Sequence, residues 1–175
     1  MNLRHKIAIG ALVLVSSSLT AFLGKWEGTG QNTAYADKLA RGLPTVCKGI
    51  TNHTSPYQVV VGDYWSDARC AEVEHLVIEK GQLALADCLT NQAIGQNTFD
   101  ALTSHGHNFG VPTTCASRAV GLINAGRIAE GCKALAWAAD GRTPVWSYVT
   151  DARGGKKFVP GLHARRLAEA DWCAK

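Results

Sequence analysis

The sequence contains no internal repeat, no low-complexity tract, and no Cys-x-x-Cys or His-Glu-x-x-His motif. The missing motifs argue against a zinc site, a thioredoxin-like redox site and a metallopeptidase. Charged residues make up only 18% of the chain and hydrophobic residues 46%, which is typical of a globular protein. The net charge of +4 mildly favours an anionic partner without identifying one. At 175 residues, the chain fits one soluble domain with a short extension.

Acidic residues are absent before Glu27. Arg4 and Lys6 precede the uncharged apolar stretch Ile7–Leu23, an order that is typical of an exported N-terminus with its start on the cytoplasmic side. A helix of this length spans about 25 Å, against about 30 Å for the hydrocarbon core of a bilayer. We therefore expect residues 1–24 to form a signal-anchor segment, in which the apolar helix Ile7–Leu23 is a short, weakly hydrophobic membrane anchor.

A cleaved signal peptide is the alternative interpretation of the same segment. The best cleavage site of the small-x-small kind ends at Ala36, well beyond the apolar stretch. Cleavage there would remove Glu27, the first carboxylate of the chain. A cut after Ala21 would put Leu19 where a small residue is needed. We therefore favour an uncleaved anchor, followed by a folded domain over residues 25–175.

Turn-forming residues and hydrophobic periodicity divide this domain into a small β-rich lobe and a larger helical lobe. Residues 25–62 are rich in Gly, Thr and Asn, and short alternating stretches such as Tyr57–Val61 predict hairpins. Ser66 is a suitable N-cap for a long helix that reaches about residue 89. Together the elements predict an α+β fold with an active-site cleft between the lobes. The other predicted helices cover residues 96–108, 114–125, 127–139 and 161–172, and the predicted loops cover residues 110–112 and 140–157.

Six cysteines are many for a cytosolic chain, and their even number suggests disulfides formed in an oxidising compartment. Their places on the predicted elements favour Cys47–Cys70, between the β-rich lobe and the long helix, and Cys132–Cys173, at the last helix. Cys88–Cys115 is then the third pair. Spacing alone leaves other arrangements open.

Glu27, Asp37 and Thr45 are the candidate catalytic residues, because they fall together in the polar, Gly-rich stretch after the anchor. Cleavage of a glycosidic bond requires a protonated acid beside the leaving oxygen, and a second group that activates water or stabilises the oxocarbenium-like transition state. Two carboxylates can supply these functions, and a hydroxyl can hold the water. Carboxylates are nevertheless most often solvated surface groups, so the pattern alone favours the simpler interpretation.

A set of short motifs along the whole soluble chain favours a catalytic role for these residues over the solvated-surface interpretation. The motifs are, in order, Glu27-Gly28, Tyr35-x-Asp37, Thr45-Val46-Cys47-x-Gly49-x-Thr51, Phe99-Asp100-Ala101-Leu102, Asn108-Phe109-Gly110 and Gly161-Leu162-x-x-Arg165-Arg166-x-x-Glu169. In this order they resemble the phage lysozyme (endolysin) family of the T4-like type, glycoside hydrolase family 24, over roughly residues 24–173.

The resemblance implies a lysozyme-like fold and a muramidase that hydrolyses the β-1,4 bond between N-acetylmuramic acid and N-acetylglucosamine in peptidoglycan. Carried over by motif, Glu27 is the general acid, Asp37 assists the water or the developing cation, and Thr45 positions that water. Arg165 is expected to reach back to the catalytic glutamate and to balance its charge. The alternative for Arg165 and Arg166 is a solvated basic helix face. The spacings between Glu27, Asp37 and Thr45 are longer than is usual in the family, and hairpin loops can absorb the difference.

With its anchor, the chain resembles the signal-anchor-release subgroup of this family. The resemblance implies an endolysin held in the host inner membrane by residues 7–23, with its catalytic domain in the periplasm. Loss of the membrane potential would release it to the periplasm, and it would act together with a holin. We expect the tethered form to be inactive, and the protein to be a monomer with no cofactor and no nucleic-acid partner. Because no cysteine precedes Cys47, thiol exchange inside the anchor is excluded.

His105 and His107 are the only pattern that suggests a metal ion, and we expect no metal site. Residues i and i+2 of a helix point to different sides, so the two rings would not converge. Helix packing is the preferred role for this pair. The tryptophans are expected to be core residues, although Trp137 could line the cleft.

Two other functions remain open at this point. A lytic transglycosylase cuts the same bond without a water-activating carboxylate, and the presence of Asp37 and Thr45 argues against it. A membrane-tethered, disulfide-stabilised protein that binds the cell wall without cleaving it is the second alternative. The clearing of purified cell walls, and the chemical nature of the product, would distinguish these functions from hydrolysis.

Overall fold

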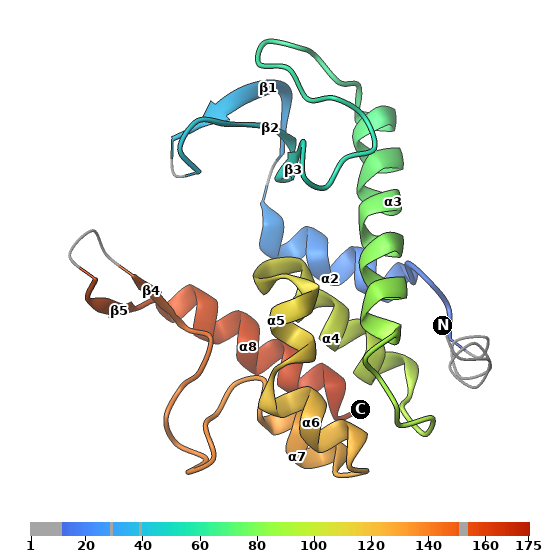
Figure 1. Cartoon of the computed structure of the whole chain (residues 1–175), viewed down its shortest axis with the longest axis vertical. Helices are drawn as coiled ribbons and strands as arrows, with labels where there is room; N and C mark the ends of the chain where they lie inside the picture. Colours follow the sequence, from blue (N-terminus) through green and yellow to red (C-terminus); the bar gives the residue numbers. More distant parts are fainter. Residues whose placement is uncertain (1–11, 29, 39, 151–153) are drawn as a thin grey trace. The chain divides into compact units, whose positions relative to one another are not determined.

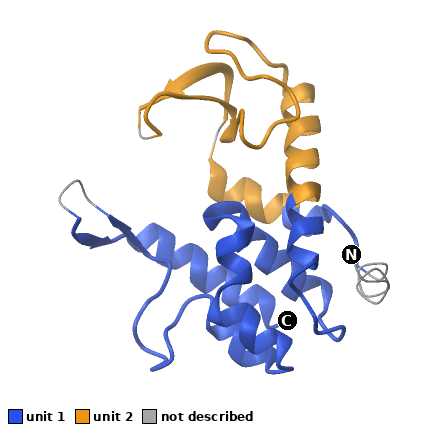
Figure 2. Ribbon diagram, viewed as in Figure 1, with its two compact units in different colours: residues 1–19, 81–175 blue, residues 20–80 orange. Residues whose placement is uncertain are grey.

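The computed structural model describes residues 12–28, 30–38, 40–150 and 154–175 (Figure 1). The described chain is mainly helical and contains two small antiparallel sheets, so the predicted α+β class is confirmed. It divides into two compact units (Figure 2). The small unit holds residues 20–80, and the large unit holds residues 81–175 together with the N-terminal residues up to Leu19.

A three-stranded antiparallel sheet occupies the small unit, as the β-rich pattern predicts. Its strands, in spatial order, are β1 (Gln31–Asp37), β2 (Leu43–Cys47) and β3 (Ile50–Thr51). Val46 and Trp65 are almost completely buried and form the centre of the core below it. The disulfide Cys47–Cys70 then links the end of β2 to the helix that follows.

The alternating stretch at residues 57–61 is not a strand, which corrects the prediction. Val59 is buried while Val60 and Val61 are exposed. The side chain of Asn52 accepts a hydrogen bond from the Val59 N–H at 2.6 Å and donates to the Val59 carbonyl at 2.9 Å. One amide side chain therefore satisfies the backbone groups that a neighbouring strand would have paired.

Helix α3 (Asp67–Ala86) is the long helix expected after Ser66. The Ser66 hydroxyl accepts a hydrogen bond from the Arg69 N–H at 3.3 Å, so the predicted N-cap is confirmed. The helix ends at Ala86, a few residues before the predicted end.

The N-terminal segment differs from the predicted apolar helix. Helix α2 (Ser17–Glu27) begins inside the apolar stretch and continues past it. Leu12 and Leu14 precede the helix and pack against the core of the large unit. Among the described residues, no helix is long and apolar enough to cross a membrane. The first part of the predicted anchor, residues 7–11, lies outside the described residues.

Helix α4 (Gln96–Phe109) is buried along nine consecutive residues and packs against α8 (Pro160–Cys173), and both were predicted within a few residues. The helix expected at residues 114–125 is instead two short helices, α5 (Val111–Cys115) and α6 (Arg118–Asn124). The Ser117 hydroxyl accepts from the Val120 N–H at 3.3 Å and starts the second of them.

Two further boundaries correct the sequence prediction. Gly110–Pro112 is not a loop, because Pro112 lies in the first turn of α5, where a missing N–H costs nothing. Helix α7 (Ile128–Lys133) ends well before residue 139. The stretch expected to be a loop at residues 140–157 contains a hairpin of β4 (Tyr148–Thr150) and β5 (Lys156–Phe158).

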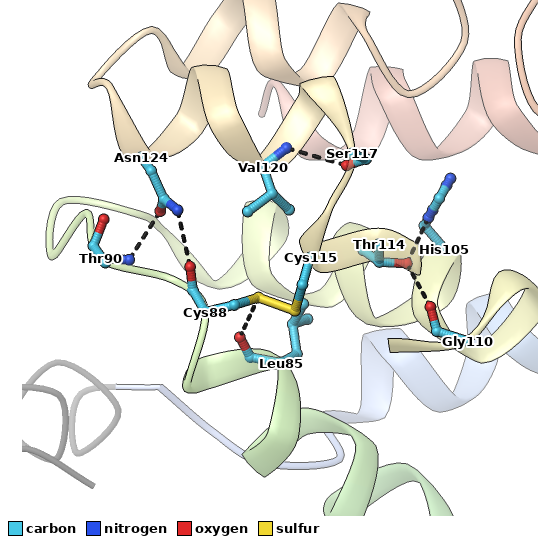
Figure 3. The surroundings of a disulfide bond; sticks show 10 residues. All are labelled: Leu85, Cys88, Thr90, His105, Gly110, Thr114, Cys115, Ser117, Val120 and Asn124. Carbon is cyan, nitrogen blue, oxygen red and sulfur yellow. Dashed lines mark hydrogen bonds between the residues drawn. A yellow bond between two sulfur atoms is a disulfide. The ribbon is translucent and has the colours of Figure 1, made fainter. Parts of the chain in front are cut away.

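Three disulfides close the fold, and they are the three pairs expected from the sequence: Cys47–Cys70, Cys88–Cys115 and Cys132–Cys173. The second joins the loop after α3 to the end of α5 (Figure 3). Beside it, Asn124 accepts from the Thr90 N–H and donates to the Cys88 carbonyl, both at 2.8 Å. This loop is therefore held by a covalent link and by a side chain of α6.

Candidate active site

The β1–β2 hairpin brings Asp37 and Thr45 to the same face of the sheet. Tyr35 pairs with Thr45 and Asp37 pairs with Leu43, so the four side chains lie on one side of the two strands. Asp37 and Thr45 are diagonal cross-strand neighbours, for which the separation is about 7–8 Å. This separation is between their Cα atoms, so both side chains project from neighbouring strands on the same face of the sheet.

Thr45 is the more fixed of the two side chains. It is only 3% exposed, and its hydroxyl donates to the Leu43 carbonyl at 3.0 Å. Because the hydroxyl proton is used in this bond, the Thr45 oxygen is available to accept a hydrogen bond. Asp37 is half-buried at the end of β1, next to the turn that leads into β2.

Glu27 is the last residue of α2 and lies in the same unit as the hairpin. Its side chain is half-buried. Leu23, one turn earlier on the same helix, is only 4% exposed and fixes the buried face of the helix. Gly28 follows with a φ of +68°, a backbone conformation that favours glycine and ends the helix before β1.

Arg165 and Arg166 belong to a buried polar cluster in the large unit. Arg165 is 5% exposed and Arg166 is completely buried, so the alternative of a solvated basic face is wrong. One carboxylate oxygen of Glu169 accepts from Arg165 at 3.3 Å and from Arg166 at 2.7 Å. The Ser104 hydroxyl donates to the same oxygen at 2.6 Å. Burial raises the pKa of Glu169, and the two guanidiniums act in the opposite direction.

The two histidines of the His-x-His pattern point to different environments, as expected. His105 is completely buried between Trp146 and Phe109, with ring centroids 4.9 Å away in both cases. His107 is exposed. Within the described ranges, no group of three or more His, Cys, Asp or Glu residues could hold a metal ion. The predicted packing role is confirmed for His105.

The tryptophans contribute mainly to packing. Trp65 is 2% exposed in the small-unit core, and Trp172 packs against the core of the large unit. Trp137 is half-buried, and its ring meets the edge of His163 at 4.9 Å between centroids. Its suggested place at a cleft stays a prediction.

A model of the phage lysozyme family matches residues 24–169. The chain belongs to the phage lysozyme family. A SAR-endolysin of Pseudomonas phage phiKMV is 32% identical over 147 residues, which are 84% of this chain and 80% of that protein. The region matched by the family model, residues 24–169, contains Glu27, Asp37, Thr45 and Arg165. As a phage lysozyme, the chain is a glycoside hydrolase of the muramidase type, an endolysin that acts on peptidoglycan.

Solved structures show the same fold in other lysozymes. An endolysin from Escherichia coli O157:H7 phage FAHEc1 superimposes with a TM-score of 0.74 at 28% identity, covering 94% of each chain. The muramidase domain of SpmX from Asticaccaulis excentricus has the same TM-score at 20% identity and covers 92% of this chain and 97% of that one. The active form of P1 phage endolysin Lyz superimposes at 0.67 with 18% identity, over 97% of this chain and 92% of that one. The last two likenesses concern the fold alone.

Several polar residues that hold this lysozyme together were missed from the sequence. Gln82 and Asp100 are completely buried in helices α3 and α4, and Ser104 and Glu169 are completely buried in α4 and α8. Asp100 and Glu169 did appear in the family motifs, but only as landmarks. The signal that could have identified them is a polar residue on the face of a helix that otherwise carries apolar ones.

Proposed function

We propose that this lysozyme hydrolyses the β-1,4 bond between N-acetylmuramic acid and N-acetylglucosamine with Glu27, Asp37 and Thr45 as its catalytic residues. The observation that supports the proposal most is the shared sheet face of Asp37 and Thr45, within the unit that also contains Glu27. A carboxylate and a fixed hydroxyl at this separation can hold one water molecule between them.

In the proposed reaction, Glu27 donates its proton to the leaving glycosidic oxygen as the bond to the anomeric carbon breaks. The water adds to that carbon and loses its proton to Asp37, whose charge also stabilises the developing oxocarbenium ion. The Thr45 oxygen accepts a hydrogen bond from the same water and orients it. The family motif assigns Arg165 the role of balancing charge at the site, and in the large unit its guanidinium pairs with Glu169 at 3.3 Å.

We also propose that the enzyme begins as a membrane-tethered, inactive endolysin in the host inner membrane and is then released to the periplasm. The basic flank and the apolar stretch support tethering, as does the similarity to a relative that is named a SAR-endolysin. In the described structure, Leu12 and Leu14 pack against the core of the large unit and Leu19 is completely buried, so these side chains cannot face a bilayer at the same time. A functional link to a holin and a monomeric state belong to the same proposal.

Zymography on purified peptidoglycan tests the catalytic assignment. Glu27→Gln removes the proton donor and should reduce the clearing rate by about 10²–10⁴-fold, which is the usual contribution of a general acid. Glu72→Gln changes an exposed glutamate of α3 in the same unit and should keep wild-type activity.

Three results would contradict the proposal. Persistent clearing by the Glu27→Gln variant would mean that the acid lies elsewhere. An anhydro-sugar product in the mass spectrum would identify a lytic transglycosylase. Binding to cell walls without clearing by the wild-type protein would indicate a non-catalytic wall-binding protein.

A further inference from the structure

Three polar side chains of the large unit form a binding site for the chain's own N-terminal segment. We call Gln82, Gln96 and Asp100 the clasp. Gln82 and Asp100 are completely buried, beside core residues such as Leu85 and Phe99. A buried amide or carboxylate is costly unless it is hydrogen-bonded, so the bonds made by these oxygens matter; the Gln82 Nε2 itself has no partner among the described residues.

The partners of the clasp lie in residues 13–16. Gln96 accepts from the Val13 N–H at 2.8 Å and donates to the Val13 carbonyl at 2.9 Å. Gln82 accepts from the Val15 N–H at 2.7 Å. The second N–H of the Gln96 amide donates to Asp100 at 2.8 Å, which connects the two residues of α4. The clasp therefore binds three backbone groups of the segment, the N–H and the carbonyl of Val13 and the N–H of Val15.

Val15 shows that this binding is strong enough to impose an unfavourable backbone conformation. Its φ is +49°, which is a genuine outlier for a β-branched residue and costs of order 1–3 kcal/mol. Strain of this kind persists only where the surroundings hold the residue in place. The hydrogen bond from Val15 to Gln82 and the contacts at Val13 and Ser16, on either side, provide that restraint.

Ser16 connects the clasp to helix α2. Its hydroxyl donates to Asp100 at 2.6 Å and accepts from the Leu19 N–H at 3.0 Å. Ser16 is thus the N-cap of α2, and Asp100 orients the capping hydroxyl. The same helix ends at Glu27. The clasp therefore controls the first turn of the helix whose last residue is the proposed general acid.

We propose that Gln82, Gln96 and Asp100 are positioning residues for the hydrolysis reaction. By holding residues 13–16, they fix the capped start of α2 and thereby keep Glu27 on a fully formed helix. The inference rests on the proposed catalytic role of Glu27. It also makes activity depend on segment binding, because residues 13–16 lie within the apolar stretch that was expected to enter the membrane.

A double-mutant cycle on Ser16 and Asp100 tests the inference with the full-length enzyme on purified peptidoglycan. Ser16→Ala and Asp100→Asn should each lower kcat by about fivefold, the factor that corresponds to loss of a typical N-cap. The apparent KM should stay within about twofold, because substrate binding is not altered. The double variant should be no slower than the slower single variant, since both act through one hydrogen bond.

Amide hydrogen exchange provides a readout that does not depend on activity. Residues 17–27 should exchange faster in both single variants, by about the same fivefold factor, while the core of α4 keeps its protection. Ser16→Thr, which keeps a capping hydroxyl, should restore both kcat and protection. Ser17→Ala and Asp87→Asn change an exposed serine and an exposed aspartate and should behave as wild type.

Three results would overturn the inference. These are additive losses in the cycle, unchanged kcat in Ser16→Ala, and faster exchange in α2 without any loss of kcat. If Asp100→Asn does not fold, the three Ser16 and Ser17 variants decide the question alone. Failure of this inference differs from failure of the proposed function, because the Glu27→Gln variant would still be inactive.

Discussion

Acid should destabilise the large unit through His105. In Figure 3 the ring nitrogen Nδ1 of this residue faces the Thr114 hydroxyl, at 2.8 Å, and that hydroxyl donates to the Gly110 carbonyl at 3.1 Å. Because the hydroxyl proton is used, His105 must donate through its Nδ1–H, which leaves Nε2 unprotonated. Nε2 is buried and has no hydrogen-bond partner among the described residues. A second proton there would create a buried, unsatisfied cation.

The size of the stability loss in acid follows from the shift in the pKa of His105 between the unfolded and the folded chain. Burial lowers the pKa of His105 to about 3, and the nearby charges of Arg166 and Arg165 act in the same direction. In the unfolded chain the pKa is about 6.5. Between these two values the unfolded state binds one more proton than the native state, so stability falls as the pH falls from 6.5 to 3. From pH 7 to pH 4.5 the loss is about 2.5 kcal/mol of unfolding free energy.

Other groups titrate in the same range with the opposite sign. Burial raises the pKa of Asp100 and of Glu169, and a raised carboxyl pKa makes stability fall as the pH rises through it. The total change in the wild-type protein is therefore smaller than the His105 contribution. A comparison with a variant that lacks the histidine separates the two effects.

Urea unfolding at pH 7 and pH 4.5 measures this contribution. His105→Asn keeps a donor that can reach Thr114 but cannot titrate, so its loss of stability on acidification should be about 2.5 kcal/mol smaller than in wild type. Tryptophan fluorescence follows the unfolding, and Trp146 contributes to it with a ring 4.9 Å from that of His105. His107→Gln, at the exposed histidine of the same helix, should keep the wild-type pH dependence. Equal pH dependence in wild type and His105→Asn would refute the reasoning.

Two further predictions concern packing and the membrane. A Cβ on Gly131 would lie 2.5 Å from Cγ1 of Ile123, so Gly131→Ala should lower the unfolding free energy by about 1–3 kcal/mol. Gly121 has open space around it, so Gly121→Ala should raise the unfolding free energy by about 0.5–1 kcal/mol. Chemical denaturation should show that the two variants change the unfolding free energy in opposite directions. A change in the same direction for both would contradict the packing described at Gly131 and Gly121. Leucines at the exposed positions Ser17 and Ser18 should each make insertion into the membrane more favourable by roughly 0.3–0.6 kcal/mol. Cell fractionation should then find more of the protein in the membrane fraction. An unchanged distribution would argue against tethering.

The parts of the fold that the sequence predicts are those with a strong local signal. Ser66 caps α3 as expected because the N-cap interaction involves only neighbouring residues. Helices α4 and α8 are recognisable because their apolar positions repeat over more than three turns. The break between α5 and α6 could not be predicted with the same certainty, since Ser117 is compatible with a helix interior and with a cap.

Long-range interactions explain the errors. The stretch at residues 57–61 alternates like a strand, but it is held by the side chain of Asn52 and not by a neighbouring strand. The β4–β5 hairpin was hidden by the glycines and the proline of residues 140–157, and its pairing of Tyr148 with Phe158 depends on residues ten positions apart. Such contacts are fixed by tertiary structure and leave little trace in local composition.

For the sheet face that carries Asp37 and Thr45, the sequence and the strand register supply different parts of the prediction. The family motifs identify Asp37 and Thr45, but their common side of the sheet depends on the pairing of β1 with β2. The longer spacings are accommodated at two places. One is a register shift between Gln31 and Tyr35, and the other is the turn before β2, where Gly42 has a φ of +84°. A slip of one residue would move one of the two side chains to the other face.

Hydropathy alone did not predict the structure of the N-terminal segment, in which helix α2 begins inside the apolar stretch and continues past it. Within α2, Leu19 and Leu23 are buried one turn apart, while Ser17 and Ser18 are exposed, which is the pattern of a helix on the surface of a soluble protein. The small and polar residues that lower the hydrophobicity of the stretch are the same ones that suit it to the folded enzyme. Ser16 is the clearest case, because a leucine there would favour the bilayer but would remove both the cap of α2 and the bond to Asp100. Under the proposed release, low hydrophobicity in this segment therefore serves twice, once for leaving the membrane and once for forming the helix that ends at Glu27.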